Sequence, residues 1–375
     1  GKDETFGIGN NGEILSVQFG LYAAEDLFAA DGSFVPNDGL LEIANCDENG
    51  NITFVTDIPV GAKLYVKEIA TDSHYILSDE KYPVTFDYAG QDTALVEIKA
   101  NGGEAIKNDI LYGSVKGLKI DRETEKPIVG AKFGLFRSAE TEFTAGNALI
   151  TAVSGEDGTF LFENVPYGNW LIKELQPADG YLSNDEIYPV RIGENGQTVG
   201  ITVVNDRTPE IGTKATVNGE KTATAEGDIT IEDTVSYKHL IPGKAYTIKG
   251  ILMDMATGKA FLVDGKELTS EVTFTPEESC GEVTVRFTFG GSKITKQTDL
   301  VVFETLYRDG VELAAHADIE DDGQSVTLIP PKPDIPQTGD NSNLGFWIGL
   351  GSVALGGVIA CIIMYCKRKK DEDDE

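Results

Sequence analysis

Three polar side chains occupy strand positions that otherwise carry inward-facing apolar residues. In the segment GNWLIKE, Glu174 falls on the same face as the tryptophan and isoleucine that alternate with it. Asn205 closes a similar run, ITVVND, and Lys119 shares a face with a valine in GSVKGLKID. One lysine, one glutamate and one asparagine are thus predicted to face a single core. Leaving such groups unpaired there costs several kcal/mol, so they should meet.

A buried lysine next to an amide can react with it. Burial disfavours charge, so a desolvated lysine loses its proton more easily and a desolvated carboxyl keeps its own. The neutral amine of Lys119 can then attack the side-chain amide of Asn205 and expel ammonia, while protonated Glu174 polarises the amide. The pattern therefore predicts a covalent cross-link made from the chain's own residues.

The elements that must position these residues are short antiparallel strands. Alternating runs broken by Gly, Asn and Asp turns indicate β-sandwiches. The pattern also repeats: FGLY at 19–22 recurs as FGLF at 133–136, and DENGNITF at 47–54 recurs as GEDGTFLF at 155–162. Before the apolar run near the carboxyl end, no segment has a sustained helical period. We therefore predict an all-β fold that contains two related modules.

The carboxyl end has a different character. Residues 344–366 carry no charged side chain and are long enough to cross a bilayer as one helix. The basic run KRKK at 367–370 follows directly and predicts a cytoplasmic C-terminus, with everything upstream outside. The Pro-rich segment 329–334 is typical of a short, stiff spacer.

A pentapeptide stands between this spacer and the apolar run. Its residues are Ile335, Pro336, Gln337, Thr338 and Gly339. With the apolar run and basic tail, it resembles the LPxTG-type sorting signal of Gram-positive cell-wall proteins, although that pattern begins with leucine. The resemblance implies that a sortase cuts between Thr338 and Gly339 and passes the Thr338 carbonyl to an amine. Pro336 presets a backbone that a groove can grip, and Gly339 permits close approach to the bond.

The second repeat copy resembles the Cna-B or SpaA-type domain, a prealbumin-like sandwich of Gram-positive pilins and adhesins. The resemblance rests on KID at 119–121, GAKFGLF at 130–136, PADGY at 177–181 and the closing Asn205. Domains of this family hold an intramolecular isopeptide bond between a lysine and an asparagine. The resemblance therefore assigns the bond to Lys119 and Asn205, with Glu174 as the helper.

For the first copy, the resemblance assigns the same roles to Glu68 and Asn108. Glu68 follows Leu64 and Val66 on one face of a predicted strand. The lysine would be Lys2, one residue short of the family spacing and at the edge of the chain. The competing interpretation is that these are an ordinary surface lysine and glutamate and a turn asparagine.

The third part of the chain resembles the VaFE repeat, a β-sandwich related to Thr-Gln ester-bond domains. The resemblance rests on TVSYKHLIPGKAYTIKGILMD at 234–254 and VVFETLYRDG at 301–310. It implies an ester formed when a threonine attacks a glutamine side chain. The residues that it assigns are the nucleophile Thr213, its target Gln324, the acid-base helpers Asp233 and Glu304, and the nearby His316.

Strand alternation bears on the choice of nucleophile. Thr213 shares a face with Ala215 and Val217, which predicts that its hydroxyl points inward. Thr216, the alternative nucleophile, alternates with Lys214 and is expected to face water. A set of paired polar groups in an ordinary core is the other interpretation of these residues.

Composition limits the function classes. The net charge of −31 argues against nucleic acid or an anionic membrane surface as a partner. The sequence contains no Gly-rich phosphate loop, CxxC pair, HExxH or GxSxG, and its three histidines are far apart. We therefore expect no cofactor, no metal and no enzyme activity.

These patterns together predict a cell-wall-anchored adhesin or an accessory or basal pilin stalk on a Gram-positive surface. Expected partners are a sortase, an amine acceptor on peptidoglycan or a pilin, and a host surface or matrix ligand; the membrane is contacted only before sorting. The alternatives are the stalk of a wall-anchored enzyme with an upstream catalytic domain, a pilus subunit, and a membrane protein never cut at Thr338.

The predicted parts follow one another along the chain. They are an N-terminally truncated SpaA/Cna-B-type sandwich at 1–110, a second at 111–206, an ester-bond-type sandwich at 207–329, a spacer with the sorting motif at 330–343, a transmembrane helix at 344–366 and a charged cytoplasmic tail at 367–375.

Overall fold

The structure, a computed structural model, describes residues 1–29, 31–87, 90, 92 and 98–332. Within these residues every regular element is a β-strand, apart from short 3-10 helices, which confirms the predicted all-β fold. No helix of the described residues has the length and apolar character needed to span a membrane. The predicted transmembrane helix and the pentapeptide 335–339 lie outside the described residues.

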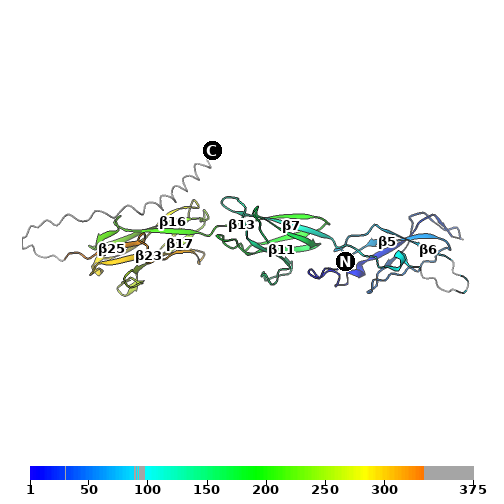
Figure 1. The fold of residues 1–375 in the computed structure, drawn as a ribbon, viewed down its shortest axis with the longest axis horizontal. Coiled ribbons are helices and arrows are strands. Elements are labelled where there is room, and N and C mark those ends of the chain that lie inside the picture. The colour runs from blue at the N-terminus through cyan, green and yellow to red at the C-terminus, as the bar shows by residue number, and fades with distance from the viewer. Residues whose placement is uncertain (30, 88–89, 91, 93–97, 333–375) are drawn as a thin grey trace, which may run out of the picture. The chain divides into compact units, whose positions relative to one another are not determined.

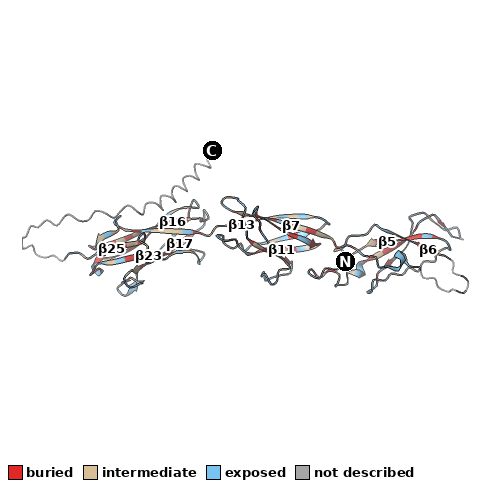
Figure 2. Cartoon of the chain, in the orientation of Figure 1, coloured by how far each residue is buried: buried red, intermediate tan, exposed pale blue. Residues whose placement is uncertain are grey.

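The chain divides into two compact units, one at Gly1–Asn205 and one that begins at Asp206. The first unit contains two separate apolar cores, one for each repeat copy. Figure 2 shows that the buried residues lie mainly on the strands, where they alternate with more exposed ones. This period-two burial is the one that the sequence predicts.

The first module is built on one sheet with the order β4-β1-β5-β6. Its core includes Phe19 and Leu21 of β1 and Leu64 and Val66 of β5, all of which are buried. Its elements are η1 (Glu13–Ser16), β1 (Gln18–Ala23), β2 (Leu27–Phe28), β3 (Phe34–Val35), β4 (Leu40–Asn45), β5 (Lys63–Ala70), β6 (Lys81–Thr85) and η2 (Ala100–Gly103).

The second module is a sandwich of two sheets, with the orders β12-β11-β8-β9 and β10-β7-β13. Phe133 of β8 stacks on Phe160 of β10 with 3.8 Å between ring centroids, which joins the sheets across the core. Its elements are β7 (Tyr112–Asp121), β8 (Lys132–Arg137), β9 (Ile150–Val153), β10 (Thr159–Pro166), β11 (Gly168–Gln176), β12 (Ile187–Ile192) and β13 (Thr198–Asn205). The first strand, β7, and the last, β13, pair in parallel (Figure 1).

Residues 3–8 pack on the second module, whereas Gly1 bonds two residues of the first, donating to the Asn108 carbonyl at 2.8 Å and accepting from the Tyr75 hydroxyl at 2.9 Å. Phe6 and Ile8 are buried in the core of the second module, where the Phe6 ring meets Trp170 edge-on at 5.0 Å. Arg137 donates a hydrogen bond to the Phe6 carbonyl at 3.0 Å, and Tyr112 donates one to the Asp3 carboxylate at 2.8 Å. Part of the range predicted for the first module thus completes the core of the second.

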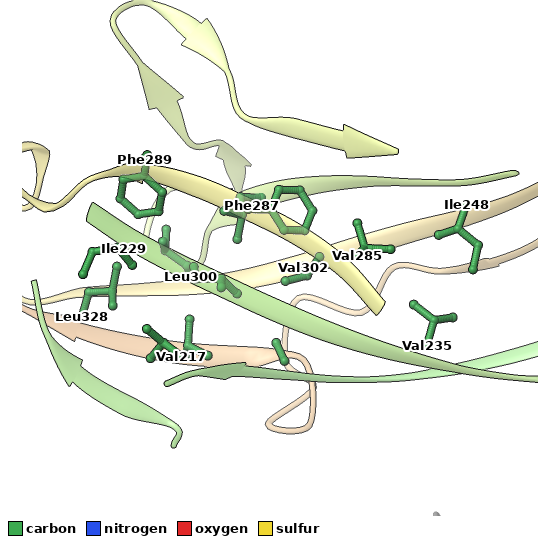
Figure 3. Packing of buried hydrophobic residues seen from close by; sticks show 14 of the residues in the cluster. Val217, Ile229, Val235, Ile248, Val285, Phe287, Phe289, Leu300, Val302 and Leu328 are labelled. Carbon is green, nitrogen blue, oxygen red and sulfur yellow. The ribbon is translucent and has the colours of Figure 1, made fainter. Parts of the chain in front are cut away.

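The third module has a three-stranded sheet, β14-β16-β22, and a seven-stranded sheet that includes β15-β25-β23-β17-β18. Figure 3 shows Phe287 and Phe289 of β22 and Leu300 and Val302 of β23 in the core between them. The elements are β14 (Glu210–Val217), β15 (Thr222–Thr224), β16 (Asp228–Lys238), β17 (Tyr246–Asp254), β18 (Lys259–Ala260), β19 (Leu262–Val263), β20 (Lys266–Glu267), β21 (Thr269–Phe274), β22 (Gly281–Gly290), η3 (Gly291–Lys293), β23 (Thr298–Arg308), β24 (Val311–His316) and β25 (Ser325–Ile329).

Candidate functional site

The structure brings Lys119, Glu174 and Asn205 of the second module together. Their exposed fractions are 0%, 5% and 2%. Glu174 Oε1 lies 3.3 Å from Lys119 Nζ, and Asn205 Nδ2 donates to both Glu174 oxygens at 2.9 and 2.8 Å. One carboxylate therefore contacts both the amine and the amide of the predicted reaction.

Three strands place this group. Lys119 on β7 is paired in register with Val203 on β13, so Asn205 lies one inward-facing position further along the neighbouring strand. Glu174 comes from β11 in the opposite sheet, on the buried face that it shares with Trp170 and Ile172. The predicted alternation of β11 is confirmed, and the sandwich itself carries the carboxyl group to the lysine and asparagine.

Backbone contacts around Glu174 could not be read from side-chain patterns. The amide N–H of Asn184 donates to Glu174 Oε2 at 2.9 Å and fixes the carboxylate. Asn205 Oδ1 is buried and accepts no hydrogen bond from the described residues. Rotating the Asn205 amide by half a turn would bring Oδ1 to Glu174, where a protonated carboxyl could donate to it.

The first module repeats part of this arrangement. Glu68 has an exposed fraction of 1% and accepts hydrogen bonds from Asn108 Nδ2 at 2.6 Å and from the Ser78 amide at 2.9 Å. Ser78 stands ten positions after Glu68, as Asn184 stands ten positions after Glu174. The glutamate and asparagine assigned to this module therefore meet as their counterparts do.

Lys2, the lysine assigned to the first module, does not reach Glu68 and Asn108. Its side chain is exposed, and Nζ donates to Asn10 Oδ1 at 3.0 Å. The amino group of Gly1 does reach the Asn108 carbonyl, at 2.8 Å, but Asp3 and Phe6 are bound to the second module and the Lys2 side chain turns to Asn10. The assignment of Lys2 is corrected accordingly.

In the third module, Asp233, Glu304 and Gln324 are fully buried. Gln324 Nε2 donates to Glu304 Oε2 at 3.2 Å, which is the same amide-to-carboxylate contact as in the other two modules. The hydroxyl oxygen of Thr213 is also buried, and its proximity to Glu304 offsets part of the rise that burial causes in the pKa of Glu304. Four of the five residues assigned to the ester bond thus come together from β14, β16, β23 and the residue before β25.

The pKa of each of the two carboxyl groups of this site is raised above its usual value. Burial, together with the neighbouring Asp233, raises the pKa of Glu304 to about 11. Burial also raises the pKa of Asp233. A pair of buried acids that retains a proton near neutral pH can donate it to an amide oxygen or to a leaving nitrogen.

The side chains of His316 and Thr216 lie outside the buried group around Glu304 and Gln324. The His316 imidazole contacts the Asp321 carboxylate at 3.0 Å, while its backbone carbonyl accepts a hydrogen bond from Gln324 Nε2 at 3.4 Å. His316 therefore lies beside the site, as predicted, but its ring points to Asp321. Thr216 Oγ1 lies 3.5 Å from the Glu232 carbonyl and does not share the buried face of its strand.

Lys221 is a residue of this region that the sequence analysis missed. Its Nζ donates to the carbonyls of Ala215, Gly323 and Ser325 at 2.8, 2.6 and 3.1 Å. Burial lowers the pKa of Lys221. It ties the strand of Thr213 to the segment of Gln324, and no motif marks it because its partners are backbone atoms. No group of residues suited to hold a metal ion occurs in the part of the chain that the structure describes.

Comparison with protein families matches all three modules. The family of SpaA prealbumin-like fold domains matches residues 8–101 and 113–207, which make up about half of the chain. The family of T-Q ester bond containing domains matches residues 209–328. The chain therefore belongs to the SpaA prealbumin-like family, with a T-Q ester bond domain after its two prealbumin-like modules.

Several solved structures of pilins and adhesins are similar to the chain. A bacterial adhesin from Mobiluncus mulieris, containing intramolecular disulfide, isopeptide and ester bond cross-links, is 22% identical, with 33% of this chain and 58% of that chain covered and a TM-score of 0.30. BcpA, the major pilin subunit of Bacillus cereus, is 16% identical, with 58% and 69% covered and a TM-score of 0.36. The Bacillus anthracis TIE protein is 16% identical, with 86% and 48% covered and a TM-score of 0.40.

The chain spans 58% of the length of the Mobiluncus mulieris adhesin. No curated protein matches the chain.

Proposed function

We propose that this chain is a stalk of a Gram-positive surface pilin or adhesin whose modules form their own covalent cross-links. The observation that carries the proposal is the shared carboxylate of the second module. Glu174 touches both Lys119, at 3.3 Å, and Asn205, at 2.8 Å, in a site closed to water. Membership of the SpaA family and the following T-Q ester bond domain support it.

The isopeptide reaction needs a proton carrier, and Glu174 is placed to be one. It takes a proton from Lys119, and the neutral Nζ attacks Cγ of Asn205. The Nζ–Cγ bond forms as the Cγ–Nδ2 bond breaks. A proton returns through Glu174 to the leaving nitrogen, which departs as ammonia. Burial assists the reaction because no water competes with the amine for the amide carbon.

The ester reaction of the third module follows the same scheme with oxygen as the nucleophile. The hydroxyl of Thr213 attacks Cδ of Gln324, and its proton ends on the leaving nitrogen, so that ammonia departs again. Glu304 contacts Gln324 Nε2 at 3.2 Å and is the group nearest to the leaving nitrogen. The proton held by Asp233 and Glu304 neutralises charge that develops on the amide oxygen.

Attachment to the cell wall completes the proposal. The pentapeptide 335–339 would be cut by a sortase after the apolar run 344–366 has held the chain at the membrane. Replacing Thr338 with alanine is expected to move the chain from the wall fraction to the membrane fraction of the cells. Wall-linked Thr338→Ala chain would contradict this step.

Intact mass is the test of the cross-links. The full chain, purified in detergent, is expected to weigh less than its sequence by two ammonias, each about 17 Da for one displacement. Lys119→Ala and Gln324→Ala should each restore one ammonia, whereas Lys173→Ala, a matched change on β11, should restore none. A mass equal to that of the sequence would overturn the proposed chemistry.

A further inference from the structure

Lys221 binds the backbone on both sides of the glutamine that the proposed ester reaction consumes. Its Nζ donates to the carbonyls of Gly323 and Ser325, the two neighbours of Gln324, at 2.6 and 3.1 Å. Its third hydrogen bond, at 2.8 Å, goes to the carbonyl of Ala215, two residues after the proposed nucleophile. An ammonium group has three N–H donors, and each of these carbonyls takes one. The amine therefore joins the two segments whose side chains must react.

A tight turn brings Lys221 to this place. Asn218 and Gly219 have φ angles of 52° and 82°, and Asn-Gly is the pair typical of a two-residue turn in which both residues are left-handed. Val217 and Glu220 exchange backbone hydrogen bonds of 2.8 and 3.0 Å across the turn. The chain thus reverses after β14 and enters β15, which pairs with β25. Lys221, the residue before β15, is therefore held next to both segments.

The bonds from Lys221 add to a weaker direct link between the same segments. The amide of Ala215 donates to the Gly323 carbonyl at 3.0 Å. A hydrogen bond from an ammonium group is roughly twice as strong as such a neutral one. Alignment of reacting groups is sensitive, because a misplacement of about 1 Å can slow a reaction by about 10²-fold. The three bonds of the lysine are thus placed to align the threonine with the glutamine.

The charge of Lys221 also acts on the buried acid pair. Asp233 of β16 is paired with Ala215 of β14, whose carbonyl the lysine holds. Burial raises the pKa of Asp233, and contact with Glu304 and the positive charge of Lys221 each offset part of this rise. The pKa of Glu304, by contrast, is raised to about 11. The lysine therefore favours the state in which Asp233 is ionised and Glu304 is protonated.

The proposed ester reaction needs an acid pair in this state. The bond from Thr213 Oγ1 to Cδ of Gln324 forms as the Cδ–Nε2 bond breaks, and ammonia departs. The pair must take the hydroxyl proton and return one proton to the leaving nitrogen, so one carboxyl has to be ionised and the other protonated. The pair holds the same number of protons before and after the reaction. With both carboxyls protonated, neither can accept the proton of the hydroxyl.

We propose that Lys221 is a positioning residue of the ester site, whose ammonium group holds the strand of Thr213 against the segment of Gln324 and keeps one carboxyl of the acid pair ionised. The proposal rests on the ester chemistry proposed for the third module. All three hydrogen bonds of Lys221 go to backbone atoms. It therefore acts on the reacting groups through the backbone and through Asp233.

Other charged groups face the same site and remain in place when Lys221 is replaced. Those near Lys221 are Asp233 of β16, Lys214 of β14, and Asp321 and Asp322 of the segment before β25. Those near Asp233 are Lys221, Glu304 of β23 and His316 of β24. A change in the pH dependence of the reaction on replacing the lysine is therefore due to the lysine.

The test measures how fast the ester forms at different pH. The parent is the full chain with Lys119→Ala, so that the second module loses no ammonia. It is collected unfolded in urea and refolded in detergent at several values from about pH 6 to about pH 9, the region around neutrality in which general bases work. Intact mass at successive times counts the chains that are lighter by one ammonia, about 17 Da.

Lys221→Met in this parent should slow the ester by about 10²-fold at the lowest pH. The slowing should become smaller as the pH rises, because Asp233 then ionises without help from the lysine. Lys266→Met makes the same change of charge at an exposed position on β20 and should leave the rate unchanged. Equal rates with and without Lys221, or a slowing by the same factor at every pH, would overturn the proposal.

A folding control accompanies the rates. The buried Leu252 amide donates to the Leu268 carbonyl at 3.0 Å and should stay protected from hydrogen exchange if the module folds. If Lys221→Met loses this protection, Lys221→Gln takes its place, because it keeps N–H donors without the charge, and the same pH-dependent slowing is expected. If the parent itself loses no ammonia from the third module, the ester and the role of Lys221 fail together. If only the variants match the parent, the ester stands and the role of Lys221 alone is disproved.

Discussion

At the scale of residues, one contact recurs in all three modules. A buried carboxylate accepts a hydrogen bond from the side-chain amide of Asn108, Asn205 or Gln324. What differs is the nucleophile: Lys119 stands at the second site, Thr213 at the third, and the described residues bring none to the first. A buried carboxylate and an amide are thus common to all three sites, and in the proposed reactions the nucleophile determines which bond forms.

Glu174→Gln tests whether the carboxyl group moves the proton. The variant keeps the size of the side chain but cannot take a proton from Lys119, so cross-linking should slow by about 10²–10⁴-fold, the usual contribution of a general base. The intact mass of Glu174→Gln should then show the loss of one ammonia fewer than that of the wild-type chain. Glu163→Gln, an exposed position on β10, should leave the mass deficit unchanged. Full cross-linking of Glu174→Gln would contradict the role of the carboxyl.

The buried acids of the third module predict a pH dependence that appears when the ester cannot form. In Thr213→Ala the folded state still binds protons at Glu304, whose pKa is raised from 4.5 to about 11, and the unfolded state releases them. The free energy of unfolding should therefore be greatest below pH 4.5 and fall as the pH rises towards 11. Urea unfolding of this module at pH 5, 7 and 9, about the usable range, would measure it.

Glu304→Gln in the same background is the control for this slope. The variant has no carboxyl group at this position to bind a proton in the folded state and release it on unfolding. The free energy of unfolding of the module should therefore depend less on pH. A stability that rises with pH in Thr213→Ala would show that the acids are ionised in the folded state.

At the scale of elements, the alternation of residues along a strand predicted which face a side chain lies on. It did not predict as well which residues contact one another. It placed Glu174 inward on β11 and Thr213 on the buried face of β14, because a strand turns every second side chain to one side. The wrong partner was Lys2, because sequence spacing does not show that Phe6 binds Trp170 of another module. Contacts made by backbone amides, such as that from Asn184 to Glu174, leave no side-chain pattern to read.

The segment at the start of the chain should detach from the second module when its anchor is shortened. Phe6→Ala removes the ring that meets Trp170 at 5.0 Å, and a Phe-to-Ala change in a core costs about 3–5 kcal/mol. The amides of Asp3 and Ile8, which bond each other's carbonyls, should then exchange hydrogen much faster. Phe28→Ala, at a ring that is 71% exposed, should not change them. Equal rates of amide hydrogen exchange in Phe6→Ala and in the wild-type protein would show that the polar contacts alone hold this segment on the second module.

At the scale of the whole molecule, each proposed cross-link would close nearly a complete module as a loop. By the chain-entropy estimate used for disulfides, such closure stabilises a module by about 4–5 kcal/mol. The denatured chain should also stay compact, so wild-type protein should migrate faster in a denaturing gel than Lys119→Ala or Gln324→Ala. The double variant should migrate slowest, and equal migration of all four proteins would be inconsistent with the loops.

The parallel pairing of β7 with β13 has a mechanical consequence. A pull on the chain enters the second module at Tyr112 and leaves it at Asn205, at opposite ends of these two neighbouring strands. With Lys119 joined to Asn205, the tension runs along β7, crosses the bond and leaves, so β8 to β12 carry no load. The module can then transmit a sustained force without extending, and most of its sheets serve only to keep water from the bond that bears the force.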